Sequence, residues 1–113
     1  MKKIILAAAA VSLLGSSSAA FAIERRNAYP SGIHVDNNRP CVFFYLKDVP
    51  QPDPAAPSAE AFAIPKSHPA FAELVAMLLT ARAAGLKIGV FTTGGYACGQ
   101  AEVNLIVMEG VAG

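Results

Sequence analysis

The sequence predicts a small α+β domain that is mainly β, with one helix covering an antiparallel sheet or a partly closed barrel. Five short segments have the apolar and β-branched composition of strands, and one segment, at about residues 69–84, has the apolar spacing of a helix. Two cysteines, Cys41 and Cys98, add the expectation of one disulfide.

Residues 1–22 have the pattern of an export signal. Two lysines precede an apolar run, Ile4–Gly15, and the stretch closes on an A-x-A cleavage pattern at Ala20–Ala22. The run of about 12 residues is well short of the roughly 20 that a spanning helix needs. We expect residues 23–113 to form one small domain that is periplasmic or secreted, with no stable membrane insertion after cleavage.

The charge balance argues against nucleic acid as a partner. Removing residues 1–22 from the 113 leaves 91, with seven basic and eight acidic side chains. No basic patch stands out among them, whereas proteins that bind nucleic acid use clustered lysine and arginine.

The two cysteines are expected to pair with each other. An even count in an exported chain favours a disulfide. The bond Cys41–Cys98 would close a loop of about 58 residues, worth roughly 4 kcal/mol by chain entropy. A free thiol, a metal ligand and a link between chains are the alternatives.

The first predicted strands form a hairpin. Residues 23–29 are expected to be loosely ordered, and Pro30–Gly32 to form a turn. Ile33–Asp36 alternates apolar and polar residues, and Cys41–Lys47 is rich in β-branched and aromatic types, so both are predicted strands. Asn37–Pro40 would connect them.

A proline-rich loop, residues 49–59, follows. Its four prolines exclude both a helix and a central strand, so we expect a stiff, extended surface connection. A ligand for a proline-recognition domain is the alternative. Ala61–Ile64 is the next predicted strand, and Pro65 ends it.

The single clear helix is predicted over residues 69–84. Pro69 suits the first helical position, Glu73 suits the positive end of the dipole, and Gly85 suits the left-handed residue that ends a helix. The apolar stripe expected to face the sheet is Phe71, Leu74, Val75 and Leu78, widened by Met77 and Leu79.

Two more strands complete the domain. Leu86–Thr93 and Ala101–Met108 have strand composition, and Gly94–Gly95 is the predicted turn between them. Cys98 lies in this connection, so its bond to Cys41 would pin the connection to the first long strand.

The same connection holds the candidate ligand-binding residues. Its hydroxyl, aromatic and amide groups are of the kinds that hold a sugar by its face and its edge, and they come from Thr92, Thr93, Tyr96 and Gln100. The alternative is a plain hairpin turn. The glycine-rich sequence is not a phosphate-binding loop, because a strand rather than a helix follows it.

No catalytic or metal-binding pattern is found. His34 and Asp36 could lie on one strand face, but no third ligand is near them in the sequence. His68 is expected to cap or pack at the start of the helix. The chain has no G-x-S-x-G motif and no evident pair of carboxylates. We therefore expect no enzyme, no metal and no other cofactor, with a small hydrolase as a weaker alternative.

The segment Pro69–Leu74, with Gly85 and the strand Leu86–Val90 after it, resembles the helix–strand segment of the B subunits of pertussis-like toxins, the subtilase cytotoxin type included. This resemblance implies an exported domain with an oligosaccharide-binding-type barrel, a disulfide, pentameric assembly and binding to cell-surface glycans. It covers residues 69–90 and carries over no glycan-binding residue.

The whole chain also resembles small exported bacterial proteins of unknown function. The resemblance lies in the segments C-x-F-F-x-L, F-A-I-P, H-P-x-F, T-T-G and A-C-G, which begin at Cys41, Phe62, His68, Thr92 and Ala97. We expect a non-catalytic exported binding module, with a cell-surface glycan or a protein as partner. The alternative is a small periplasmic inhibitor or scaffold protein. A homo-oligomer could form through exposed strand edges.

Overall fold

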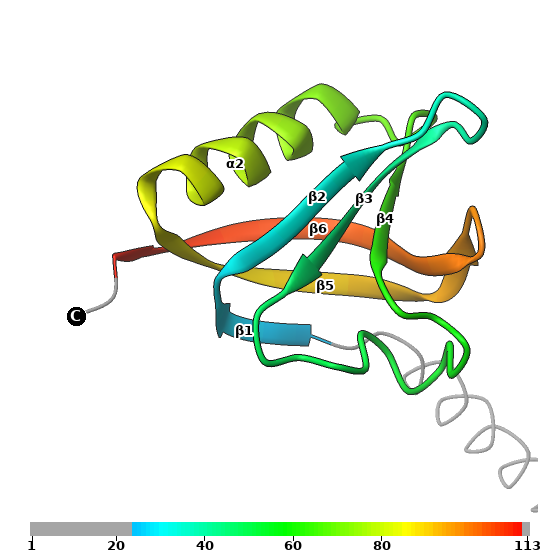
Figure 1. Ribbon diagram of the computed structural model, residues 1–113, viewed down its shortest axis with the longest axis horizontal. Helices are drawn as coiled ribbons and strands as arrows, with labels where there is room; N and C mark the ends of the chain where they lie inside the picture. Colours follow the sequence, from blue (N-terminus) through cyan, green and yellow to red (C-terminus); the bar gives the residue numbers. More distant parts are fainter. Residues whose placement is uncertain (1–23, 112–113) are drawn as a thin grey trace, which may run out of the picture.

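One helix and six strands make up the part of the chain that the computed structural model describes, residues 24–111 (Figure 1). The strands are β1 (Glu24–Ala28), β2 (Pro30–Val35), β3 (Cys41–Leu46), β4 (Phe62–Pro65), β5 (Leu86–Ala97) and β6 (Gln100–Val111), with helix α2 (Phe71–Ala84) between β4 and β5. The export signal predicted at residues 1–22 lies outside the described residues. Within those described, no helix has the length and apolar content needed to span a membrane.

The strands form one mixed sheet in the order β1-β5-β6-β4-β3-β2. Only β4 and β6 pair in parallel, and the other four pairs are antiparallel. β1 and β2 are consecutive in the chain, separated by Tyr29 alone, yet they form opposite edges of the sheet. The sheet must therefore curl until its edges approach. It stays open, because the pairings of the described strands include no ladder between β1 and β2.

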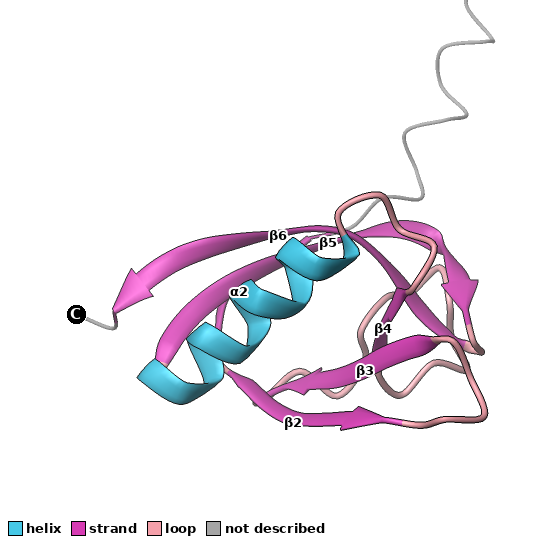
Figure 2. Cartoon of the chain, turned by 90° about the horizontal axis from the view of Figure 1, so that it is seen from above, coloured by secondary structure: helices cyan, strands magenta, loops and turns pink. Residues whose placement is uncertain are grey.

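Helix α2 lies across the open side of this curled sheet, between the β2–β3 part and the β5–β6 part (Figure 2). Three helix residues, Leu74, Leu78 and Ala81, are fully buried against the sheet. The main core beneath them includes Phe44 stacked on Phe62, together with Ile64, Ile88, Val90 and Val103. Mainly β architecture with one covering helix is thus confirmed. Leu79 is 51% exposed, so the prediction that it widens the buried stripe was wrong.

The helix begins two residues later than predicted, at Phe71 rather than Pro69. Ala70 is the N-cap residue and supplies no side-chain cap, but its N–H donates to Nδ1 of His68 over 2.9 Å. His68 therefore holds the start of the helix, as the sequence predicts. At the other end, Gly85 has φ 70°, and its N–H donates to the carbonyl of Ala81, which confirms the predicted left-handed end.

Two predictions for the N-terminal segment were wrong. Residues 24–28 form an edge strand, β1, because they pair with β5 far away in the sequence, with Arg25 opposite Val90. Their side chains are mostly exposed, so the strand has no apolar pattern to reveal it. Pro30–Gly32 belongs to β2 instead of a turn; a proline is tolerated at the first residue of an edge strand.

The predicted turn at Gly94–Gly95 was also wrong. β5 continues through both glycines to Ala97, which pairs with Gln100. The chain reverses at Cys98 and Gly99, whose φ values are 51° and 80°. Both values are positive, as a tight two-residue hairpin turn requires. Gly94, with φ 89°, instead lies in an irregular stretch of the β5–β6 ladder. Such irregularities bend long strands, as a curled sheet requires.

The disulfide Cys41–Cys98 is present, with 6.5 Å between the Cα atoms. It joins the start of β3 to the hairpin turn between β5 and β6, which is the connection that the sequence predicts. Both sulfurs lie in a small second core with Phe43, Ala63 and Ala97. The bond therefore fastens the tip of the long hairpin to the start of β3, the strand next to the edge strand β2.

Candidate functional site

The proline-rich loop is fixed to the sheet, and two of the four residues predicted to bind ligand hold it there. Thr92 is fully buried, and its hydroxyl donates to Oδ2 of Asp53, itself 1% exposed, over 2.7 Å. Gln100 Oε1 accepts the N–H groups of Glu60 and Ala61 over 2.8 and 3.0 Å. These two side chains anchor the middle and the end of the loop, and the buried Thr92 hydroxyl does not face a surface ligand.

Further contacts fasten the start of the same loop. The guanidinium of Arg25 donates to the carbonyls of Gln51 and Pro52 over 2.8 and 3.2 Å. Ala56 and Ala59 are buried in the main core. The loop is therefore a folded, partly buried wall rather than the extended surface connection that its prolines suggest.

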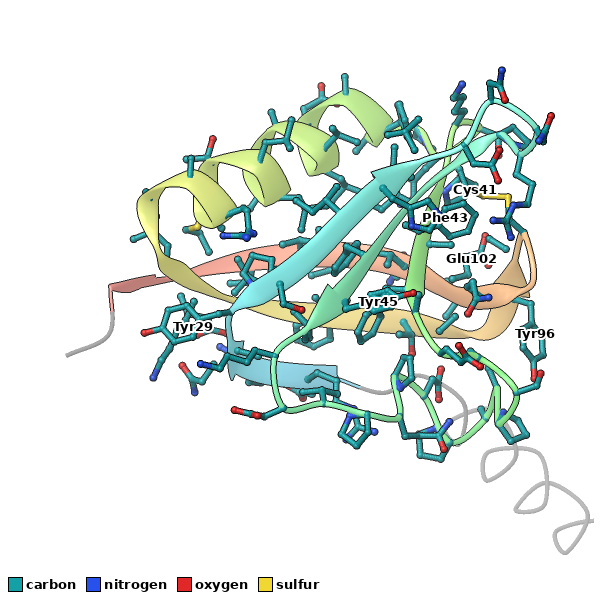
Figure 3. All side chains as sticks on the ribbon, viewed as in Figure 1. Tyr29, Cys41, Phe43, Tyr45, Tyr96 and Glu102 are labelled. Atoms are coloured by element: carbon teal, nitrogen blue, oxygen red, sulfur yellow. A yellow bond between two sulfur atoms is a disulfide. The ribbon has the colours of Figure 1, made fainter. Side chains whose placement is uncertain are left out.

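The other two predicted residues, Thr93 and Tyr96, are exposed at the end of the β5–β6 hairpin. The Thr93 hydroxyl donates to Oε1 of Glu102 over 2.9 Å. The Tyr96 ring is 46% exposed, and its hydroxyl lies 3.1 Å from Oγ of Ser58 (Figure 3). The structure thus leaves these two at the surface, each with a polar partner, and turns Thr92 inward.

The outer face of β2 and β3 carries a covered aromatic ring, Phe43. The His34 ring stacks on it with 4.9 Å between centroids, and the Arg39 guanidinium lies 4.4 Å from its centre. Phe43 is only 1% exposed as a result. Two contacts lower the pKa of the Asp36 carboxyl. The larger effect comes from a hydrogen bond donated by the backbone N–H of Asn38, and the second comes from the Arg39 guanidinium, which also donates to this carboxyl.

Both histidines make structural contacts. The described residues contain no group of three or more His, Cys, Asp or Glu side chains that could hold a metal ion. His34 lies on Phe43. Since Nδ1 of His68 accepts from Ala70, its Nε2–H donates to the carbonyl of Asn104, over 2.8 Å. Both rings therefore have structural contacts.

Tyr45, the next outward residue of β3, has an uncovered ring that is 39% exposed. The neighbouring residue on β2 is Gly32, which has no side chain. A Cβ atom built at this position would lie 3.8 Å from the Tyr45 ring. Gly32 therefore has no side chain to cover the ring, which stays partly exposed. The buried residues on either side, Phe44 and Leu46, point to the opposite face, as alternation along a strand requires.

Tyr45 forms one wall of a surface hollow of about 420 Å³ between the end of β3 and the proline-rich loop. The other lining residues are Leu46, Asp48, Val49, Pro50 and Glu60. The hollow thus combines one aromatic face with two carboxylates. Asp48 has φ 63°, a left-handed conformation that aspartate tolerates, and Gln100 holds the backbone of Glu60. The backbone of Glu60 is therefore held by a side chain of β6.

Sequence reasoning did not single out this hollow, although one signal was present. Tyr45 is an aromatic residue between two apolar ones on a predicted strand, so alternation alone places its ring on the outer face. The contribution of Glu60 could not be found in this way, because the path of the proline-rich loop depends on contacts with distant strands.

No protein-family model, no curated protein and no solved structure matches this chain.

Proposed function

We propose that the protein is a non-catalytic binding module, and that it holds a saccharide in the hollow beside Tyr45. The supporting observation is the half-open Tyr45 ring standing in one hollow with Asp48 and Glu60. A sugar offers an apolar face of C–H groups and a rim of hydroxyls. An aromatic ring matches the face, and carboxylate oxygens accept hydrogen bonds from the rim.

The fixed walls of the hollow favour binding. A ligand that orders a flexible loop loses affinity, whereas a preformed site avoids that loss. Here the loop that carries Glu60 is held by Asp53–Thr92 and by Gln100. The saccharide would meet a surface already in its bound shape.

A small hydrolase is the second candidate, and one observation favours it. Asp48 and Glu60 line the same hollow, and glycosidases use a pair of carboxyl groups. A general acid in such a pair is normally tuned by burial, whereas both of these residues are exposed. Binding is therefore the better-supported proposal.

Action outside the cytoplasm is part of the proposal. The disulfide supports it, because such bonds persist in oxidising compartments, and the signal-like pattern of residues 1–22 agrees. Assembly into a homo-oligomer stays a prediction, to be checked by the light-scattering mass of the oxidised protein; a pentamer would support the resemblance to toxin B subunits.

The test is a glycan array probed with the oxidised protein and three variants. Tyr45→Ala is expected to weaken binding at least about tenfold, since the loss of a central aromatic contact costs more than 1.4 kcal/mol. Tyr45→Phe, which keeps the ring, should retain most of the signal. Tyr96→Ala is the matched control, because that ring is equally exposed on a different part of the surface.

Each outcome separates the alternatives. A signal lost in Tyr96→Ala but kept in Tyr45→Ala would move the site to the β5–β6 hairpin and contradict the proposal. A silent array, with a defined protein partner that co-purifies, would favour the inhibitor or scaffold function. Turnover of a bound saccharide that is lost in Asp48→Asn or Glu60→Gln would favour the hydrolase.

A further inference from the structure

Two adjoining hollows surround Tyr29, at the junction of β1 and β2, well away from the predicted hairpin site (Figure 3). Their volumes are about 320 and 380 Å³, and both are lined by Tyr29 and Lys47. The first also has Arg82 from the end of α2, and the second has Lys87 from β5. Segments far apart in the sequence thus bring basic groups around one aromatic ring.

The charged side chains that line these hollows are mainly basic. The two hollows are lined by four basic side chains and by one acidic side chain, Asp48. Arg26 is neutralised, because it contacts both oxygens of Glu109 over 2.6 and 3.0 Å and also pairs with Glu24. The other three cations are Lys47, Arg82 and Lys87, and no ion pair is found for any of them within residues 24–111.

Two of the three cations, Arg82 and Lys87, have side-chain contacts beside Tyr29, and Lys47 is tied to it through the backbone. Arg82 Nε donates to the carbonyl of Ser31 over 3.0 Å, which leaves its terminal nitrogens without a hydrogen-bond partner among the described residues. Lys87 Nζ lies 5.6 Å from the centre of the Tyr29 ring. The N–H of Lys47 donates to the carbonyl of Tyr29 over 2.8 Å. The Arg82 and Lys87 side chains are therefore oriented before any ligand arrives, whereas the Lys47 side chain is free to adjust to one.

The fold itself does not require this cluster. A cation near the negative end of a helix is favourable, which accounts for Arg82 in the last turn of α2. It does not account for Lys47 or Lys87, which lie outside the helix and add like charge to the same place. Gathered like charges oppose folding and are typical of a surface that attracts a ligand of opposite sign.

We infer that the hollows around Tyr29 bind an oxyanion substituent, a sulfate, phosphate or carboxylate group, carried by a saccharide. Arg82 can contact such a group through its terminal nitrogens, and the two lysines supply further N–H donors. Lys87 lies over one face of the Tyr29 ring, and the ring lines both hollows, where it can contact the sugar that bears the group. The first of the two hollows is lined by seven residues, and this size suits one substituted sugar better than an extended polyanion.

Continuity of the surface connects this site to the saccharide hollow. The second Tyr29 hollow and the Tyr45 hollow share Asp48 and Val49 as lining residues. One oligosaccharide could therefore place a neutral ring on Tyr45 and an acidic ring at Tyr29. The saccharide part of this inference rests on the proposed function, whereas the anion part rests on the cations alone.

The experiment measures dissociation constants from amide chemical shifts of the isotope-labelled, oxidised protein. The probes are a sulfated disaccharide, its unsulfated counterpart, sodium sulfate and vesicles of phosphatidylglycerol. The sulfated sugar is expected to bind at least about fivefold more tightly than the unsulfated one, with shifts at Tyr29 and Gly85, and to weaken as salt is raised. Lys47→Gln and Arg82→Gln should each remove most of that preference.

Lys66→Gln is the matched control, because Lys66 is an exposed cation outside all three hollows. A loss of binding in Arg82→Gln has two explanations, a lost ligand contact and disturbed folding. Lys47→Gln separates them, since Lys47 is exposed and its side chain makes no hydrogen bond to another described residue. Equal binding of both disaccharides, with Lys47→Gln unchanged, would overturn the inference and leave the proposed function intact.

The remaining outcomes are also decisive. Shifts at Tyr29 with sodium sulfate or with vesicles, but with neither disaccharide, would overturn the assignment to a saccharide. In another outcome, both disaccharides bind, the sulfated one binds more tightly, and binding is lost in Lys47→Gln but unchanged in Tyr45→Ala. This result would refute the proposed Tyr45 site and support the inference.

Discussion

Replacement of both cysteines by alanine is expected to lower the free energy of unfolding by about 4 kcal/mol. The bond joins positions 57 residues apart. Closing a loop of that size in the unfolded chain removes an entropy of roughly 14 cal/mol/K, and this entropy multiplied by 298 K gives the figure. A small domain has only about 5–15 kcal/mol in total, so the variant should be marginal.

Urea unfolding followed by circular dichroism measures this loss. With a slope of about 1–1.5 kcal/mol/M for a small protein, the midpoint should fall by about 3 M. The wild-type protein under reducing conditions is the control, because it loses the bond and keeps both side chains. If reduced wild type and the double variant both stay within about 1 kcal/mol of the oxidised protein, the loop-closure reasoning is refuted.

Three further changes test the packing and the charges, each by the urea midpoint. Thr92→Val leaves the buried Asp53 carboxylate without its hydroxyl donor, so a loss of about 1–3 kcal/mol is expected, and an unchanged midpoint would contradict the role of this contact. Leu78→Ala empties a fully buried site in the core and should lose about 2–5 kcal/mol. Arg26 lowers the pKa of the Glu109 carboxyl, so the stability from this pair is present above the usual glutamate pKa and lost as the pH falls through the lowered value. Glu109→Gln should therefore make the midpoint less sensitive to pH below about 5, and an unaltered pH profile would exclude the pair as a contributor.

Most of the fold could be predicted because its signals are local. The aromatic and β-branched run at Cys41–Leu46 and the apolar spacing of Phe71–Ala84 identify β3 and α2 without further information. The disulfide followed from the even cysteine count. By contrast, β1 carries the polar sequence ERRNA and is a strand only because β5 offers its edge, a long-range pairing that no local pattern contains.

The candidate site was less predictable, for the same reason. The polar side chains of Thr92 and Gln100 suggested a ligand-facing turn, yet both were needed to hold the proline-rich loop. Whether a threonine faces inward depends on what packs against it, and its partner Asp53 is 39 positions away. Tyr45, whose orientation follows from alternation, was within reach of sequence reasoning.

The pairing of β1 with β5 also has a consequence for the order of folding. Glu24 lies opposite Phe91, so β1 cannot join the sheet until β5 has been synthesised. Until then, the segment that becomes β1 has no strand to pair with. Contacts this distant in sequence slow folding.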